Sequence, residues 1–146
     1  MRLNLQTDFA LRLLMHLAVN ENELPTIAEV ATRFGISKNH LMKVANLLVR
    51  GGYVDAVRGR AGGLRLARPP EKIGVGEIVR ATEVDLAIVE CLKDGGGECL
   101  ITPSCRLKGV FREATQAFLQ TLDRYTLADL TRRNSKLRDF LSLTAA

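Results

Sequence analysis

The chain lacks the features that mark a membrane or secreted protein. None of its apolar runs approaches the roughly 18 residues that a membrane-spanning helix needs. The first segment is interrupted by Arg12 and His16 and has no small-residue cleavage pattern, so it does not resemble a signal peptide. We therefore expect a cytoplasmic protein that does not bind a membrane.

The sequence also lacks the usual marks of an enzyme. It contains no nucleophile beside a plausible base and no phosphate-binding loop, so we expect no catalytic activity. No internal repeat or low-complexity tract appears. With 47% hydrophobic positions among 146 residues, the chain can form one ordinary globular domain, or two small ones that share a core.

Positive charge is concentrated in the first half of the chain. Residues 1–80 carry 12 Lys and Arg against 7 Asp and Glu, whereas residues 81–146 carry 9 of each. Between Lys38 and Arg68, seven basic residues face Asp55 alone. This local excess is typical of a surface that binds a polyanion, although a solvated surface without a partner could carry it too.

Apolar spacing and capping residues predict two helices before residue 36. The first runs over residues 7–20, with Thr7 as its cap. The second begins at Thr26, which stands in capping-box spacing with Glu29, and it ends at Gly35.

A third helix is predicted from its cap, Ser37, to about Arg50, where two glycines end it. One of its faces is apolar, and the opposite face carries donors and cations but no acid. The apolar face comprises Leu41, Val44, Ala45 and Leu48, and the polar face comprises Asn39, Lys43, Asn46 and Arg50.

Two strand-like runs follow, "YVDAV" and "LRLA", joined by "RGRAGG", whose glycines permit positive φ. The order of helix, helix-turn-helix and hairpin predicts a winged helix. A short helix around residues 75–81 closes this unit. We therefore expect a mainly α protein in which residues 1–82 form a winged helix-turn-helix DNA-binding domain.

The third helix and the hairpin turn are the candidate DNA-binding elements. The N-terminal part of the helix would enter the major groove, and the turn would enter a minor groove. The alternative is a solvated amphipathic helix and ordinary exposed arginines, but the two elements support each other. The candidate residues are Ser37, Lys38, Asn39, His40 and Lys43 on the helix, and Arg58 and Arg60 in the turn.

All three cysteines of the chain, Cys91, Cys99 and Cys105, lie within fifteen consecutive positions. Structural zinc prefers four ligands with paired cysteine spacing, and a disulfide would leave one thiol over. Three thiolates in a glycine-rich loop can instead bind an iron–sulfur cluster, with the glycines at 95–97 letting backbone amides approach the sulfides. Buried inert cysteines are the remaining alternative. We expect residues 83–106 to form a cluster-binding loop.

A long helix is predicted after the cysteines. Its apolar residues recur at helical spacing, and such a stripe favours a second copy as partner over packing on its own domain. Residues 107–146 are therefore expected to hold a dimerisation helix and a C-terminal segment, with a short helix from Thr126 and no clear pattern after Thr131. The stripe comprises Leu107, Phe111, Ala114, Phe118, Leu122 and Tyr125.

Several motifs together, "TDFALRLLMHLA", "ISKNHLMKV", "VRGRAGGLRLARPPEKIGVGEIVRATE", the three cysteines and "LDRYTLADL", resemble the bacterial winged-helix iron–sulfur transcriptional regulators. The resemblance covers nearly the whole chain and is closest to the nitric-oxide-sensing repressors. It implies a homodimer on a double-stranded DNA operator, with a cluster of the 2Fe–2S or 4Fe–4S type on Cys91, Cys99 and Cys105. It also implies that damage to the cluster by nitric oxide relieves repression.

In sensors of this type a fourth ligand can be an aspartate near the N-terminus of the other subunit, and Asp8 is the matching position. The alternative for Asp8 is an ordinary i,i+4 pair with Arg12 at a helix N-terminus. Two other functions compete with nitric oxide sensing. One is a regulator of the same fold that senses cluster supply or redox state, and the other is an iron–sulfur electron-transfer protein.

Overall fold

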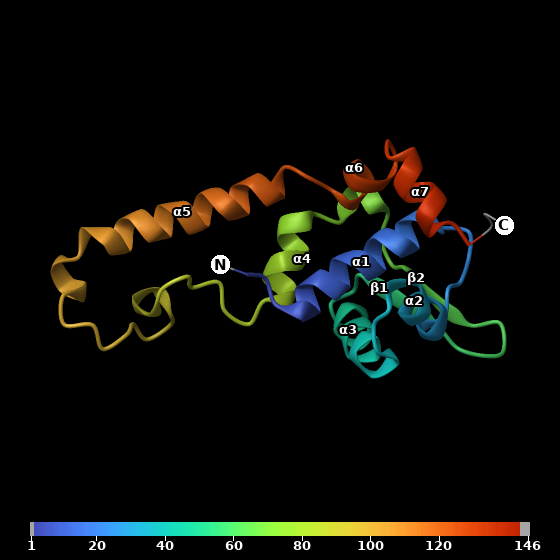
Figure 1. Cartoon of the computed structure of the whole chain (residues 1–146), viewed down its shortest axis with the longest axis horizontal. Helices are drawn as coiled ribbons and strands as arrows, with labels where there is room; N and C mark the ends of the chain where they lie inside the picture. The colour runs from blue at the N-terminus through green and yellow to red at the C-terminus, as the bar shows by residue number, and fades with distance from the viewer. Residues whose placement is uncertain (1, 144–146) are drawn as a thin grey trace.

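A computed structural model of the chain describes residues 2–143. The winged-helix body lies at one end, and the α5 helix extends from it to the cysteine segment at the other end (Figure 1). No helix among the described residues is long and apolar enough to cross a membrane. The elements are α1 (Leu5–Val19), α2 (Ile27–Phe34), α3 (Lys38–Arg50), β1 (Val54–Val57), β2 (Gly63–Leu66), η1 (Pro70–Lys72), α4 (Val75–Thr82), η2 (Glu90–Leu92), η3 (Thr102–Ser104), α5 (Arg106–Asp123), α6 (Leu127–Thr131) and α7 (Ser135–Leu141).

The α1 helix is the centre of the core, and it contacts α3, α4 and α6. Its cap is Asn4, whose side chain accepts a hydrogen bond from the Thr7 amide at 2.8 Å, so the prediction of Thr7 as the cap was wrong. Thr7 instead lies inside the first turn and is fully buried. The buried apolar residues of this helix are Ala10, Leu13, Leu14, Leu17 and Ala18.

The predictions for α2 and α3 are confirmed. Thr26 and Glu29 form the capping box, and Gly35 ends α2 with a left-handed φ of 62°. The Ser37 hydroxyl accepts a hydrogen bond from the His40 amide at 3.2 Å and caps α3. All four residues of the predicted apolar face of α3 are buried in the core.

The predicted hairpin is also confirmed, as an antiparallel pair in which Val54 lies opposite Leu66. It is anchored to the loop between α1 and α2, because the Leu64 amide donates to the Pro25 carbonyl at 2.9 Å. Gly63 passes so close to this loop that a Cβ on it would overlap the carbonyl oxygen of Leu24. A side chain at position 63 would therefore push the wing away from the body.

The chain returns to the body after α5. The Val75 amide donates to the Tyr125 carbonyl at 2.9 Å, and the Leu127 amide donates to the Ile73 carbonyl at 2.9 Å. The short helix predicted from Thr126 is α6, which packs on α1. The tail, for which the sequence offered no pattern, forms α7 and also contacts α1.

The predicted long helix is α5, although Tyr125 lies beyond its end. No residue of α5 is buried, and its contacts within the described chain are mainly with α4. Leu107 and Val110 are 55% and 58% exposed. Within the predicted stripe Leu107, Ala114 and Tyr125 are exposed and Phe111, Phe118 and Leu122 are half-buried, so the rest of the chain covers it only in part.

Candidate nucleic-acid interface and metal-ligating loop

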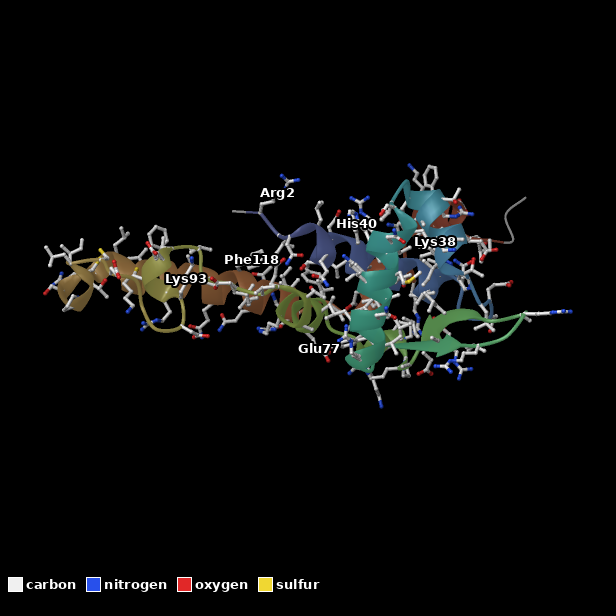
Figure 2. The ribbon with its side chains drawn as sticks, turned by 90° about the horizontal axis from the view of Figure 1, so that it is seen from below. Arg2, Lys38, His40, Glu77, Lys93 and Phe118 are labelled. Atoms are coloured by element: carbon white, nitrogen blue, oxygen red, sulfur yellow. The ribbon has the colours of Figure 1, made fainter. Side chains whose placement is uncertain are left out.

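The polar face of α3 is free to meet a ligand. Ser37, Lys38, Asn39, His40 and Lys43 are all exposed. Figure 2 shows Lys38 and His40 at the N-terminal end of α3, with their side chains directed outward. Neither lysine forms an ion pair within residues 2–143. The capped N-terminus of α3 thus presents cations and hydrogen-bond donors without a competing acid.

The wing tip has the same character. Arg58 and Arg60 are exposed in the hairpin turn, on either side of Gly59, which has a φ of 111°. Neither arginine has an ion-pair partner among the described residues. Asp55, the one acid of this basic segment, is paired with Arg65 across the hairpin at 3.5 Å. The positive charge at the tip is therefore not neutralised locally.

Arg68 belongs to the basic segment of the sequence, but its side chain contacts other residues of the protein. Its guanidinium lies 4.6 Å from the centre of the Tyr53 ring and 2.9 Å from the carboxylate of Glu77 on α4. Burial alone would raise the pKa of Glu77, but hydrogen bonds from Arg68 and Tyr53 outweigh it and hold that pKa below its ordinary value. This group fixes the base of the wing to α4.

The three cysteines occupy different parts of the segment between α4 and α5. Cys91 lies in η2 and Cys105 immediately precedes α5, and both are half-buried, whereas Cys99 is exposed. All three are free thiols. Within residues 2–143, no three His, Cys, Asp or Glu side chains are arranged to hold a metal ion. The single chain therefore does not bring the three thiols together.

The segment nevertheless has the chemistry that a thiolate-bound cluster requires. No disulfide occupies its thiols, and three soft sulfur donors suit iron–sulfur ligation better than a four-ligand zinc site. Gly95 and Gly96 have φ values of 91° and 65°, which favour glycine. Among the described residues, the backbone hydrogen bonds that the cysteine segment makes after residue 88 all join residues of the segment itself. A change in the shape of this loop would therefore break no backbone hydrogen bond to the core.

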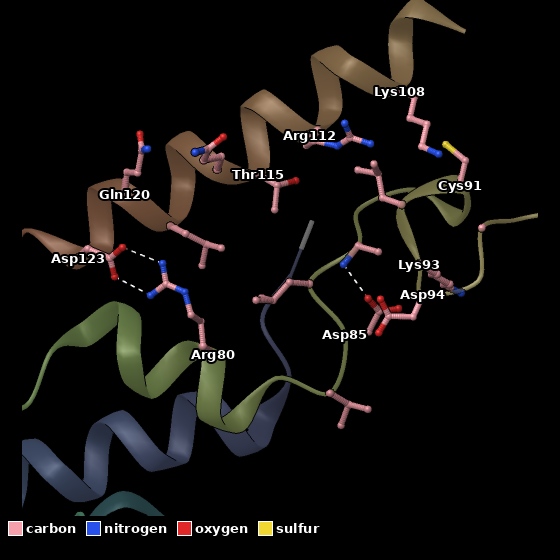
Figure 3. A pocket seen from close by; sticks show the side chains of 17 residues that line it. Arg80, Asp85, Cys91, Lys93, Asp94, Lys108, Arg112, Thr115, Gln120 and Asp123 are labelled. Atoms are coloured by element: carbon pink, nitrogen blue, oxygen red, sulfur yellow. Dashed lines mark hydrogen bonds and ion pairs between the residues drawn. The ribbon is translucent and has the colours of Figure 1, made fainter. Parts of the chain in front are cut away.

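A cleft of about 870 Å³ lies between this segment and α5. Figure 3 shows Cys91 at one end of it, with the side chains of Lys108 and Arg112 directed from α5 toward the same space. At the other end Arg80 and Asp123 are joined by two hydrogen bonds. The cleft thus runs from the cysteine segment to the junction of α4 and α5.

Asp8 lies in the first turn of α1 and pairs with Arg12 at 2.7 Å. Both side chains are about two-fifths exposed, at 42% and 41%. The ion pair that the sequence offered as the alternative to metal ligation is therefore present. The same chain does not place Asp8 with the cysteines in a metal-binding group.

Glu83 is a polar contact that sequence reasoning missed. Its carboxylate accepts hydrogen bonds from the Asn4 amide at 2.9 Å, the Asn4 side chain at 3.1 Å and the Thr7 hydroxyl at 2.6 Å. The Thr82 hydroxyl adds a bond to Thr7 at 2.8 Å. The start of the cysteine segment is therefore tied to the first turn of α1.

His16 is buried in the core, and neither ring nitrogen has a hydrogen-bond partner in the described part of the chain. Its ring meets Phe34 edge to face at a centroid distance of 6.0 Å. Burial, with a smaller contribution from Arg33, lowers the pKa of His16 to about 4. The imidazole is therefore neutral at pH 7.

Comparisons with known proteins agree with this architecture. The Rrf2 family model, described as an iron-dependent transcriptional regulator, matches residues 3–133. The chain is 46% identical to the HTH-type transcriptional regulator NsrR of Geobacillus kaustophilus over 142 residues, covering 97% of both chains. It is also 46% identical to NsrR of Bacillus subtilis over 144 residues, covering 98% of this chain and 99% of that relative.

Solved structures show the same fold. The cysteine regulator CymR of B. subtilis, at 22% identity, superposes with a TM-score of 0.73 over 90% of this chain and 97% of its own. IscR of T. potens, at 25% identity, gives a TM-score of 0.70 over 89% of this chain and 85% of its own.

Proposed function

The chain belongs to the Rrf2 family of DNA-binding transcriptional regulators, and we propose that it is a homodimeric repressor that senses nitric oxide through an iron–sulfur cluster. The observation that carries the proposal is three free thiols in one segment of a chain that matches NsrR proteins at 43–46% identity over nearly its whole length. Its site of action is the cytoplasm, where thiols stay reduced.

The DNA-binding surface consists of the polar N-terminal half of α3 and the wing tip. We propose that Ser37, Lys38, Asn39, His40 and Lys43 reach the major groove or its phosphates. Arg58 and Arg60 would reach the adjacent minor groove. Two such surfaces in a dimer read half-sites about 34 Å apart. Residues 1–82 would form the DNA-binding domain, to which α6 and α7 add.

The exposed stripe of α5 supports the dimer. No position of this 18-residue helix is buried, and Leu107 and Val110 are more than half exposed, so these apolar side chains stay in water unless a partner covers them. A second copy of α5 offers a matching stripe, since a two-fold interface uses the same surface on both subunits. The segment at 83–106 would then lie beside the dimer helices.

Cys91, Cys99 and Cys105 would hold the cluster, with Asp8 of the partner subunit as the proposed fourth ligand. When bound, the cluster would supply thiolate-ligated iron, the chemistry with which nitric oxide would react. A carboxylate is a hard, replaceable ligand for iron, so a site with three thiolates and Asp8 would open faster than a site with four thiolates. The segment that holds the three cysteines begins at Glu83, which is bonded to α1, and α1 packs against α3, so loss of the cluster would act on α3 through these contacts.

The test is anaerobic purification followed by an absorption spectrum and an operator-binding assay, both repeated after addition of nitric oxide. We expect iron and sulfide in the parent, loss of the cluster spectrum with nitric oxide, and weaker operator binding. Each Cys→Ser variant should lose cluster content, whereas Ser104→Ala in the same segment should keep it. Operator binding that followed cluster content but ignored nitric oxide would indicate a sensor of cluster supply or redox state.

The role of Asp8 is tested against its ion pair. Asp8→Ala should alter the cluster spectrum and its rate of loss, because the variant removes a ligand. Arg12→Ala breaks the same ion pair and keeps the carboxylate, so it is the matched control. Equal spectra for Asp8→Ala and the parent would remove Asp8 from the ligand set.

A further inference from the structure

The helix α5 is fixed to the winged-helix body at one end only. It spans 18 residues, or about 27 Å, and none of them is buried. The hydrogen bonds between residues 73–75 and 125–127 hold the chain just beyond its C-terminal end. The rest of α5 projects away from the body (Figure 1). The angle of α5 therefore depends on contacts near its last turn.

The strongest polar contact at that end is the ion pair between Arg80 on α4 and Asp123 on α5. The two guanidinium nitrogens donate to the two carboxylate oxygens at 2.6 and 2.7 Å (Figure 3). This two-bond geometry fixes direction as well as distance, which a single contact between flexible side chains does not. Hydrogen bonding from Arg80 also holds the pKa of Asp123 below its ordinary value.

Gly76 makes room for this ion pair. It lies one turn before Arg80 on α4, and a Cβ at position 76 would overlap Oδ1 of Asp123. The same Cβ would stand 3.0 Å from a guanidinium nitrogen of Arg80. The Asp123 carboxylate therefore packs directly against the backbone of α4. Any side chain at position 76 would displace it while leaving both charges in the chain.

We propose that Arg80, Asp123 and Gly76 are positioning residues that set the angle between α5 and the DNA-binding body, and with it the half-site spacing that the repressor accepts. This inference rests on the proposed α5 dimer, because the angle then fixes both recognition helices relative to the shared axis. A change of about 10° over about 27 Å moves the far end by about 5 Å, more than the roughly 3.4 Å between base pairs. A small change in the angle of α5 at this junction would therefore change the half-site spacing that the dimer binds best.

The experiment measures affinity for a set of operators whose half-sites are separated by the natural spacing or by one base pair more or less. The full-length, cluster-loaded protein is compared with Arg80→Gln, Asp123→Asn and Gly76→Ala at one salt concentration. We expect the parent to bind operators of one spacing more tightly than the others. In each variant the ratio of these affinities should fall about threefold or more, and sedimentation should show that the variant is still a dimer. The reversed pair, Arg80→Asp with Asp123→Arg, should recover part of this ratio.

A matched control is the ion pair between Glu71 in η1 and Arg132, the residue that follows α6, which involves no residue of α5. Glu71→Gln should leave the spacing preference unchanged. The inference is overturned if Asp123→Asn and Gly76→Ala keep the spacing preference of the parent, or if Glu71→Gln loses as much of it. A parent that bound DNA only as a monomer would instead contradict the proposed dimeric repressor, and the sedimentation measurement separates that failure from the first.

Discussion

Replacing the buried imidazole of His16 by an isobutyl group should remove an acid-sensitive step from the folding equilibrium. The ring is fully buried in α1, and neither nitrogen has a partner among the described residues. Its pKa is lowered from 6.5 to about 4, first by burial and then by Arg33. Protonation of His16 is therefore less favourable in the folded protein than in the unfolded chain.

The sign of the effect follows from this difference. Above pH 6.5 the imidazole is neutral in both states and contributes no pH dependence. Between pH 6.5 and about 4 the unfolded chain binds a proton that the folded protein does not, so the free energy of unfolding falls as the pH falls. Each pKa unit corresponds to about 1.4 kcal/mol, so the loss reaches about 3 kcal/mol near pH 4 and then levels off.

At pH 7 two smaller effects oppose each other in His16→Leu. The leucine removes a buried ring whose nitrogens lack hydrogen bonds, and leaving such groups unpaired costs about 1–3 kcal/mol. It also loses the edge contact with Phe34, which is worth about 0.5–1.5 kcal/mol. We therefore expect His16→Leu to be as stable as the parent at pH 7, or more stable, and clearly more stable at pH 4.5.

The assay is urea unfolding of the cluster-free protein, followed by circular dichroism between pH 7.5 and 4.5 at fixed protein and salt concentrations. Carboxylates also titrate in this range, but both proteins share them, so the difference between the two curves isolates His16. His40→Gln, which removes the exposed imidazole, is the control. Parallel loss of stability in the parent and His16→Leu would show that His16 is not held neutral in the folded core.

Four other substitutions test the proposed site and its supports. Lys43→Ala and Arg60→Ala should each weaken operator binding about fivefold or more at fixed salt, measured by fluorescence anisotropy, whereas Lys136→Ala on α7 should not. Unchanged binding in both variants would contradict the proposed docking of α3 and the wing on DNA. Glu83→Ala should lower the free energy of unfolding by about 2 kcal/mol in urea, since it leaves three donors without their charged acceptor; a loss within error would mean that water replaces the carboxylate. Gly63→Ala should displace the wing, weaken operator binding and lower the melting temperature, and a variant equal to the parent in both measurements would contradict the close approach to the α1–α2 loop.

The features that the sequence predicted correctly are those that depend on neighbours in the chain. The capping box at Thr26 and Glu29 spans three residues, and both groups that make it are visible in the sequence. The Ser37 cap and the apolar face of α3 depend on equally short spacings. The cap of α1 was misassigned because Asn4 and Thr7 are both suitable capping residues. In the structure the Asn4 side chain accepts from the Thr7 amide, whereas the Thr7 hydroxyl donates to Glu83.

The features that the sequence missed depend on residues far apart in the chain. The α7 helix is held by Asn20, whose side chain donates to the Leu141 carbonyl at 2.9 Å across 121 positions. The seven residues of α7 would be marginal as an isolated helix, so their local pattern was too weak to predict one. His16 was taken as an interruption of an apolar segment, because the sequence does not show that its ring points into the core.

Three polar contacts converge on α4 and on Glu83, the residue that follows it, and their spacing explains how so short a helix can hold several parts of the molecule. Glu77 bonds to Arg68 at the base of the wing, Arg80 to Asp123 on α5, and Glu83 to the first turn of α1. Three residues of helix turn about 300°, so each successive side chain points about 60° away from the one before it. The wing, the long helix and α1 therefore meet α4 on adjacent sides. A displacement of α4 must strain at least one of the three contacts, so this helix joins the start of the cysteine segment to the base of the wing, to α5 and to α1.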